Sequence, residues 1–308
     1  MRIIADTTDF KILQPTAVAI GKFDGLHKGH RKLLKQVLQT KEKGYLSTIF
    51  TFDPPPEVLF GKRQAKEITT KEEKRIIFEK MGVDILIEYP LNYENAAIEP
   101  EEFVRKILKE QMNMSYLAAG YDVTFGNKGA GNAALLKSMA KECDFELDII
   151  EKVCEEGREI SSTFIREEVD KGNMTYVANL LGEPYMIVSK VVHGAKLGRK
   201  IGMPTINLLP EKEKMLPPNG VYYSRTCIGK KEYKSITNIG KKPTVSDEEQ
   251  IGVETYLYEF DQDVYGKNAI VKILEFKRPE RKFTDVDELK KQMLNDINDG
   301  RYYESSGV

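Results

Sequence analysis

The stretch GKFDGLHKGH, residues 21–30, follows a short apolar run and opens a segment with helical periodicity. The run TAVAI at residues 16–20 predicts a strand, and residues 28–43 place their apolar side chains on one face of a helix. His27 and His30 are three residues apart, so both can face the same side of the helix N-terminus. Because a helix N-terminus presents free backbone N–H groups and a favourable dipole to anions, the stretch predicts a polyphosphate site rather than a plain turn.

The first half of the chain continues this alternation of strand and helix. Apolar runs predict further strands at 46–52, 84–88 and 116–119, and helical periodicity marks 71–81 and 101–112. Such an alternation is typical of a parallel sheet covered by helices on both faces. We therefore expect an α/β nucleotide-binding domain here.

The second half has a different pattern, which begins after the Gly-Glu-Pro turn at 182–184. Short β-rich runs separated by Gly and Pro turns lie at 186–192, 221–228, 233–239, 253–260 and 269–276, and a final helix is expected at 285–298. This pattern is typical of a small antiparallel barrel or sandwich. The sequence therefore predicts two domains, residues 1–183 and residues 184–308.

The composition argues against several classes of protein. Lys and Arg number 47 against 48 Asp and Glu, so the net charge of −1 gives no reason to expect nucleic acid or an anionic membrane as a partner. No apolar run approaches the ~20 residues of a membrane span, and the N-terminal stretch lacks the apolar core of a signal peptide. The 3 cysteines have no metal-ligand spacing, so we expect a reduced, cytoplasmic protein.

A second group of phosphate donors lies in ISSTFIR, residues 160–166. The hydroxyls of Ser161, Ser162 and Thr163 and the guanidinium of Arg166 are good hydrogen-bond donors to a triphosphate. Taken alone, the segment is more typical of an ordinary helix N-cap. Together with the histidine motif it favours nucleotide binding.

The second half contains no P-loop motif, so phosphoryl transfer there would need another loop. The candidate is GAKLGRKIGMPTIN, residues 194–207, with glycines at four-residue intervals. Thr205 and Asn207 alternate on a short extended run, so both point to one face and could supply oxygen ligands to Mg²⁺. A glycine-rich turn before a barrel strand remains an equally good interpretation of the spacing.

The motif pair G-x-F-D-G-x-H-x-G-H and I-S-S-T-x-I-R resembles the adenylylating domain of bacterial bifunctional riboflavin kinase/FAD synthetases, within the HxGH nucleotidyltransferase superfamily. The resemblance implies a Rossmann-like α/β domain in which His27 and His30 are catalytic and contact ATP. Two positions differ from the family pattern: Pro55 stands where His is usual, and Val123 where Phe is usual. The resemblance also implies ATP binding by Gly21, Phe23, Asp24, Gly25, Asp122, Ser161, Ser162, Thr163 and Arg166.

Residues 194–207 resemble the riboflavin kinase motif G-x-x-L-G-R-x-[IL]-G-x-P-T-x-N, and blocks at 218–222, 236–244, 254–266 and 278–283 resemble the rest of that domain. The resemblance implies a Greek-key β-barrel with a final helix, with Glu254 as the catalytic base. It also implies flavin binding by Asn238 and Arg278. Tyr256 stands where the family often has His. The ATP-binding residues implied for the kinase are Gly194, Gly198, Arg199, Gly202, Pro204, Thr205 and Asn207, the last two also holding Mg²⁺.

The expected function is bifunctional: riboflavin is phosphorylated to FMN, and FMN is adenylylated to FAD with release of pyrophosphate. ATP, riboflavin and FMN are the expected small-molecule substrates, and Mg²⁺ is the expected cofactor. Two alternatives are an adenylyltransferase for another phosphorylated acceptor and a flavin-binding regulatory protein without activity.

Overall fold

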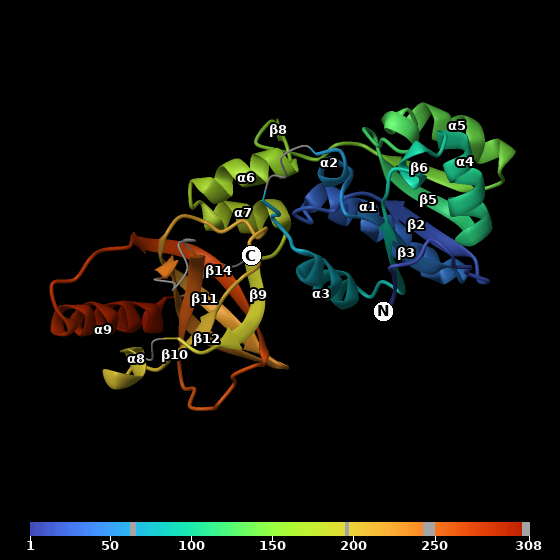
Figure 1. Cartoon of the computed structure of the whole chain (residues 1–308). Helices are drawn as coiled ribbons and strands as arrows, with labels where there is room; N and C mark the ends of the chain where they lie inside the picture. Colours follow the sequence, from blue (N-terminus) through green and yellow to red (C-terminus); the bar gives the residue numbers. More distant parts are fainter. Residues whose placement is uncertain (62–65, 195–196, 243–249, 304–308) are drawn as a thin grey trace. The chain divides into compact units, whose positions relative to one another are not determined.

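The computed structural model describes residues 1–61, 66–194, 197–242 and 250–303. The chain forms two compact units: unit 1 comprises Met1–Ala65 and Lys74–Ser161, and unit 2 comprises Lys66–Glu73 and Ser162–Val308 (Figure 1). This division differs from the expected boundary at residue 184. The chain from Ser162 onward joins the second unit, and so does a short segment from within the first half.

Within its described residues, unit 1 is built on a six-stranded sheet in which all neighbouring strands run parallel, as expected. The order β1-β4-β3-β2-β5-β6 reverses direction beside β2, because the chain first builds the sheet on one side of β2 and later on the other. In open α/β sheets, ligands bind outside the carboxyl ends of the strands at such a reversal. The strands are β1 (Arg2–Ala5), β2 (Thr16–Ile20), β3 (Leu46–Asp53), β4 (Ile85–Pro90), β5 (Met114–Gly120) and β6 (Glu146–Ile150).

The helix that follows β2 buries one apolar face against this sheet. In α1 (Lys28–Gln39) the buried residues are Leu33, Leu34 and Val37, and the helix packs on β2 and β5. The expected helix at 28–43 ends in a 3₁₀ turn, η1 (Thr40–Lys43), and the one at 101–112 is a short α4 followed by wider π-helical turns. The other elements are α2 (Pro56–Leu59), α3 (Lys71–Met81), η2 (Asn95–Ala97), α4 (Pro100–Glu102), η3 (Phe103–Gln111), η4 (Asn127–Gly129), α5 (Ala133–Glu142), β7 (Cys154–Glu155) and β8 (Arg158–Glu159).

Unit 2 is a closed antiparallel barrel with the order β10-β13-β12-β11-β14-β9. The five β-rich runs expected from the sequence each form a strand, and the extended run at Thr205 forms a further one. The expected final helix is present and continues to Tyr302. The elements are α6 (Ser162–Asp170), α7 (Met174–Leu181), β9 (Tyr185–Val192), α8 (Leu197–Lys200), β10 (Thr205–Leu208), β11 (Gly220–Ile228), β12 (Lys231–Lys242), β13 (Gln250–Leu257), β14 (Asn268–Pro279) and α9 (Val286–Tyr302).

The barrel interior holds a chain of hydroxyl groups that bond to one another. Thr237 Oγ1 lies 3.0 Å from Thr255 Oγ1 and 2.8 Å from Ser224 Oγ, and Ser235 joins Ser224 to Thr226. All five residues are buried. Since side chains alternate across a strand, the neighbours of an inward residue such as Thr255 point outward. Polar chemistry on β13 therefore belongs to the outer face of the barrel.

The last helix, α9, covers part of this outer face. Ile297 packs with Val221 and Ile236 of the barrel, and Tyr256 lies partly buried against the same cluster. The Tyr258 hydroxyl donates a hydrogen bond to the Ile297 carbonyl at 2.5 Å. Consequently α9 borders the strip of β12 and β13 that carries the polar residues discussed below.

A segment from the first half of the chain completes unit 2. Glu67 forms an isolated parallel bridge with Lys214, and the carboxylate of Glu73 accepts a hydrogen bond from the Val188 backbone at 3.1 Å. Thr70 and Glu73 bond reciprocally, backbone to side chain, in a capping box at the start of α3. Local sequence pattern gives no sign of this addition to the barrel.

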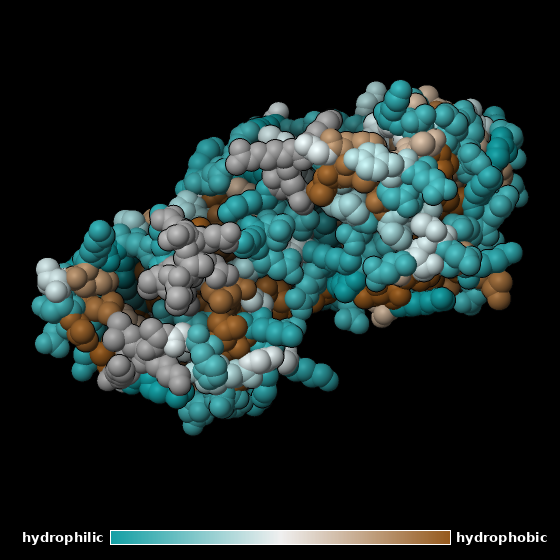
Figure 2. Space-filling view, in the orientation of Figure 1, coloured by the Kyte–Doolittle hydropathy of each residue, from teal (hydrophilic) through white to brown (hydrophobic). Residues whose placement is uncertain are grey.

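The visible surface of each unit is mostly hydrophilic, with separate hydrophobic patches (Figure 2). No helix within the described ranges combines the length and the apolar character needed to span a bilayer. Two of the exposed large hydrophobic residues, Phe60 and Tyr93, belong to unit 1 and are considered with its site.

Candidate active sites

The reversal of strand order in unit 1 brings the predicted histidine motif to a ligand-binding position. The motif follows the carboxyl end of β2, and Asp122 follows the carboxyl end of the adjacent β5. His27 is the N-cap of α1, where its Nδ1 accepts a hydrogen bond from the His30 backbone N–H at 3.4 Å. The structure thus places both imidazoles at the helix N-terminus, as the spacing predicts.

The two imidazoles stack on each other, with ring centroids 3.8 Å apart. Burial, together with the nearby His30, lowers the pKa of His27 to about 3, against opposing contributions from Asp24, Glu159 and Asp122. Burial likewise lowers the pKa of His30 to about 4. Both rings are therefore neutral at pH 7 in the free protein. A neutral imidazole whose Nδ1 accepts a bond carries its proton on Nε2, which leaves His27 with a donor for a phosphate oxygen.

The Nδ1 atom of His30 is buried and has no hydrogen-bond partner within the described part of the chain. A hydrogen bond to the Gly25 backbone involves the same ring and opposes the fall in its pKa. Buried polar atoms are normally satisfied by protein or by ordered water or ligand. This unsatisfied nitrogen is a structural sign that the site is built for a bound group.

The other residues of the motif support the histidines in different ways. Phe23 is fully buried and packs on His30, with ring centroids 5.3 Å apart, so any part it has in ATP binding is indirect. A Cβ on Gly29 would lie 3.0 Å from the His27 ring, and one on Gly21 would lie 3.0 Å from the Phe23 ring. Gly25 has φ 64°, which glycine adopts without strain. The small residues thus allow the rings to pack closely.

The predicted donors of ISSTFIR fall in both units. Ser161 closes the range of unit 1, whereas Ser162 begins α6 of unit 2, with Thr163 exposed in its first turn. Arg166 donates from Nε to the Lys66 carbonyl at 3.4 Å within unit 2. Their contact with ATP stays a prediction.

The two departures from the family pattern have different surroundings. Pro55 is the residue before α2 and offers no side-chain cap to it. Val123 packs against the hydrophobic core of unit 1. The valine therefore changes packing, whereas the proline removes a polar side chain near the carboxyl end of β3.

Sequence reasoning missed an exposed aromatic pair in unit 1. Phe60 is 51% exposed and Tyr93 is 70% exposed, with ring centroids 6.1 Å apart. They follow the carboxyl ends of the neighbouring strands β3 and β4, and the Tyr93 hydroxyl donates to the Leu59 carbonyl at 2.9 Å. Large aromatic rings are usually buried, so an exposed pair at the ligand edge of a sheet favours contact with a planar ligand. The sequence signal that could have indicated this pair is Tyr93, an aromatic residue within the polar turn after β4.

The outer face of the barrel brings the predicted kinase residues together. Glu254 of β13 pairs with Asn207 of β10 on one side and with Asn238 of β12 on the other. Residues paired across antiparallel strands share a face. Thr205 lies on the same face as Asn207, and its hydroxyl donates to Glu254 Oε1 at 2.5 Å. Glu254 thus lies between the strand expected to hold MgATP and the strand expected to hold the flavin.

The glycines before β10 make room for these side chains. A Cβ on Gly194 would lie 2.5–2.7 Å from the side-chain amide of Asn207. A Cβ on Gly198 would collide with the Met203 carbonyl and lie 3.3 Å from Thr205 Oγ1. Gly202 has φ 82°. The glycine spacing therefore serves close approach of backbone to the polar residues of β10.

Several predicted residues of this loop have less defined surroundings. Arg199 and Pro204 are exposed, as expected for residues that would meet a ligand. Ala195 and Lys196 of the loop, and Pro243 and Thr244 of a later kinase block, lie outside the described residues.

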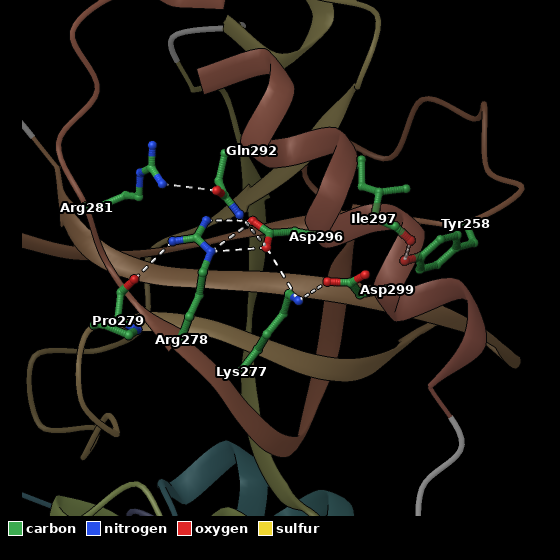
Figure 3. A network of polar contacts seen from close by, with 9 residues as sticks. All are labelled: Tyr258, Lys277, Arg278, Pro279, Arg281, Gln292, Asp296, Ile297 and Asp299. Atoms are coloured by element: carbon green, nitrogen blue, oxygen red, sulfur yellow. Dashed lines mark hydrogen bonds and ion pairs between the residues drawn. The ribbon is translucent and has the colours of Figure 1, made fainter. Parts of the chain in front are cut away.

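Arg278 is held by protein groups in this structure (Figure 3). Its guanidinium donates to Asp296 of α9, with the shortest contact 2.6 Å from Nη2 to Oδ2, and to the Pro279 carbonyl at 3.0 Å. Its expected contact with the flavin stays a prediction. Tyr256 lies on the same outer face as Glu254, packed edge-to-face on Tyr258 with centroids 5.3 Å apart.

Comparison with known proteins agrees with this two-site arrangement. The family model described as FAD synthetase matches residues 9–164, and the one described as riboflavin kinase matches residues 181–303. The chain is 33% identical to the bifunctional riboflavin kinase/FMN adenylyltransferase of Listeria monocytogenes, over 93% of this chain and 91% of that one. It is 34% identical to the protein of the same name from Bacillus subtilis, over 94% and 92%.

A crystal structure titled macrolide-efflux protein from Streptococcus pneumoniae has the same fold, with a TM-score of 0.85 and 30% identity over 98% of this chain and 99% of that one. The matches support the bifunctional interpretation over an adenylyltransferase for another acceptor or a protein that only binds flavin, because each half of the chain matches its own enzyme family. The chain therefore belongs to the family of bifunctional riboflavin kinase/FMN adenylyltransferases, which phosphorylate riboflavin to FMN and adenylylate FMN to FAD.

Proposed function

We propose that Glu254 is the base of the kinase reaction and that Thr205 and Asn207 hold MgATP beside it. The observation that carries this proposal is the pairing of Glu254 with Asn207 on one side and Asn238 on the other. That register would place the carboxylate beside both substrates if β10 holds MgATP and β12 holds riboflavin. Residues 184–308 would then carry the kinase activity, and residues 1–183 the adenylylating activity.

In the kinase step the riboflavin 5′-hydroxyl attacks the γ-phosphorus of ATP, and its proton passes to Glu254. ADP leaves in line with the attacking oxygen. A positioned carboxylate is typically worth ~10²–10⁴ in rate, because the hydroxyl is a poor nucleophile until its proton has an acceptor. The Glu254 carboxylate already accepts a hydrogen bond from the Thr205 hydroxyl, which fixes one of its oxygens.

The donor set on β10 fits Mg²⁺. Thr205 and Asn207 offer neutral oxygens, and Gly194 leaves space at the Asn207 amide that a Cβ would fill. Mg²⁺ takes oxygen ligands and keeps several waters, so two protein oxygens beside ATP phosphates are sufficient. The ion would neutralise charge on the β- and γ-phosphates during transfer.

In the adenylylation step the FMN phosphate attacks the α-phosphorus of ATP and expels pyrophosphate. No base is needed, since the attacking phosphate is already an anion. His27, neutral and with its Nδ1 occupied, would donate from Nε2 to a phosphate oxygen as charge develops. We propose that Phe60 and Tyr93 contact the flavin ring of FMN in this unit, because they are exposed together at the ligand edge of the sheet.

In this proposal the chain binds riboflavin, FMN and ATP. It excludes two other classes of partner, nucleic acid and membranes. The near-zero net charge supports the first exclusion. The cysteines Cys143, Cys154 and Cys227 are free, which agrees with a cytoplasmic location.

The test is a time course of riboflavin, FMN and FAD with the full chain and excess MgATP. Wild type should produce transient FMN and then FAD, with FMN accumulating because Pro55 offers no polar contact. Glu254→Gln should slow FMN formation by ~10²–10⁴ while still converting added FMN to FAD. Changing both His27 and His30 to Ala should stop FAD formation and leave FMN formation near wild type.

The control for the carboxylate is Glu259→Gln, the same change of charge at an exposed position just after β13. It should leave both activities within about twofold of wild type. A Glu254→Gln enzyme that retains kinase turnover within a few-fold would reject Glu254 as the base. Equal loss of both activities in a folded double-histidine variant would reject the separate roles of the two sites.

A further inference from the structure

Asp296 is a buried carboxylate on the outer surface helix of unit 2. It is 3% exposed, and both of its oxygens lie 3.1 Å from Arg278 Nε (Figure 3). Gln292 donates to it at 3.2 Å, and Lys277 Nζ lies 3.7 Å away. A buried charge is stable only when it is paired and hydrogen-bonded, and here three side chains surround the carboxylate. The strongest of these interactions is the set of charge-assisted hydrogen bonds from the Arg278 guanidinium to the Asp296 carboxylate.

The same guanidinium also contacts the last residue of β14. Arg278 Nη1 donates to the Pro279 carbonyl at 3.0 Å, which orients the next residue, Glu280. Glu280 Oε1 accepts a hydrogen bond from Asn238 Nδ2 at 3.3 Å. A Cβ at Gly240 would collide with the Glu280 carboxylate, so this segment lies directly against β12.

Asn238 is also the cross-strand neighbour of Glu254. The contacts therefore run from Asp296 through Arg278 to Glu280 and Asn238, and they end beside the proposed base. We infer that Asp296 is a positioning residue of the kinase: through Arg278 it fixes residues 278–280 along the riboflavin side of Glu254. The inference rests on the proposed function for Glu254 and Asn238. A misplacement of ~1 Å at a reacting centre can cost ~10²-fold, so such a support has a measurable effect.

The competing explanation is that Asp296 only fastens α9 to the barrel. The helix has other attachments there: Lys277 pairs with Asp299 by a salt bridge at 2.5 Å, Lys234 donates to the Arg301 carbonyl at 2.6 Å, and Tyr303 stacks on Tyr223 at 4.0 Å. These contacts do not involve Asp296. Asp296→Asn can therefore weaken the ion pair with Arg278 while α9 stays docked.

The test compares Asp296→Asn with Asp299→Asn in the full chain. The control removes the same charge from the same helix but touches Lys277 instead of Arg278. We expect Asp296→Asn to raise the KM for riboflavin roughly tenfold or more and to leave the KM for ATP and the adenylylation of added FMN within about twofold. Asp299→Asn should leave all three within about twofold, and Asp296→Glu should restore part of the riboflavin affinity.

Three results would overturn the inference: an equal rise in KM for both kinase substrates, the same effect in Asp299→Asn, or an unchanged riboflavin KM in a folded Asp296→Asn protein. Thermal unfolding of each variant establishes folding, and if Asp296→Asn does not fold, Asp296→Glu takes its place with the same expected direction. Glu254→Gln is assayed alongside. If that variant keeps its kinase turnover, the proposed base is wrong, whereas the riboflavin KM of the Asp296 variants still decides the positioning role.

Discussion

The ion pair between Lys214 and Glu73 allows a large, testable effect on the stability of unit 2. The Lys214 side chain is 1% exposed and that of Glu73 is 0% exposed, with 2.6 Å between Nζ and Oε2. The ammonium also donates to the Ile68 carbonyl at 2.7 Å and lies over the Tyr185 ring. Removing one partner of such a pair costs ~3–5 kcal/mol, because the other charge stays buried and unpaired.

Glu73→Gln breaks this pair and keeps the shape of the side chain. Val188 and Thr70 donate from their backbone N–H groups to different oxygens of Glu73, and glutamine has a single acceptor oxygen, so the variant loses the charge and one of these two hydrogen bonds. For a unit of roughly 150 residues, each kcal/mol shifts the Tm by ~2–4 °C, which predicts a fall of about 6–20 °C. The measurement is circular dichroism of the full chain during heating, with residual kinase activity after each temperature step to assign the transition to unit 2.

A double variant tests the physical reason. Glu73→Gln combined with Lys214→Met removes the stranded ammonium, so it should be more stable than Glu73→Gln alone. The control is Arg225→Met, which breaks an exposed pair with Glu232 and should cost under ~1 kcal/mol. A Tm shift below about 4 °C for Glu73→Gln, or no recovery in the double variant, would refute the reasoning.

Three further predictions concern pH, the glycine loop and the domain boundary. In the folded protein the pKa values of His27 and His30 lie below the ordinary histidine value near 6.5, so the unfolded chain binds more protons between about pH 4 and 6.5. Unit 1 should therefore lose stability as the pH falls through that range. His30→Gln should reduce this pH dependence in unfolding curves measured at a series of pH values. Gly194→Ala should lower kinase turnover and spare conversion of added FMN, since its Cβ would displace the Asn207 amide; normal kinase kinetics would contradict the close approach. A fragment that starts at Glu183 lacks Glu73, the partner of Lys214, so circular dichroism should show that it is poorly folded. Lys214→Met should improve the folding of this fragment. A stable, active wild-type fragment would show that residues 66–73 are dispensable for unit 2.

The regular elements were largely predictable because each has a local cause. The apolar run of β2 is buried along its whole length, and α3 begins and ends where its periodicity does. The edge strand β1 was missed because its four residues are too few to show a period. The place of residues 66–73 in unit 2 could not be predicted, since it depends on tertiary contacts with Lys214 and Val188.

The candidate sites divide in the same way. The alternation of Thr205 and Asn207 predicted a shared face, and the strand register confirms it. Their position beside Glu254 depends on the pairing of β10 with β13, which no spacing rule predicts for residues so far apart in the sequence. The bond from Arg278 to Asp296 had no signal in the sequence, and the low pKa values of the histidines depend on burial that only the fold creates.

The discontinuity of unit 2 has a consequence for synthesis on the ribosome. Every residue of unit 1 has been made once Ser161 is added, whereas residues 66–73 must wait for the barrel that completes their surroundings. At ~5–20 residues per second, roughly 10–40 s separate the emergence of Glu73 from that of the last barrel strand, β14. Until Val188 and Lys214 emerge, the reciprocal hydrogen bonds with Thr70 are the native contacts of Glu73 described above whose partner has already been made. Unit 1 can therefore fold before synthesis ends, whereas unit 2, which includes residues 66–73, can be completed only after its last barrel strand has emerged.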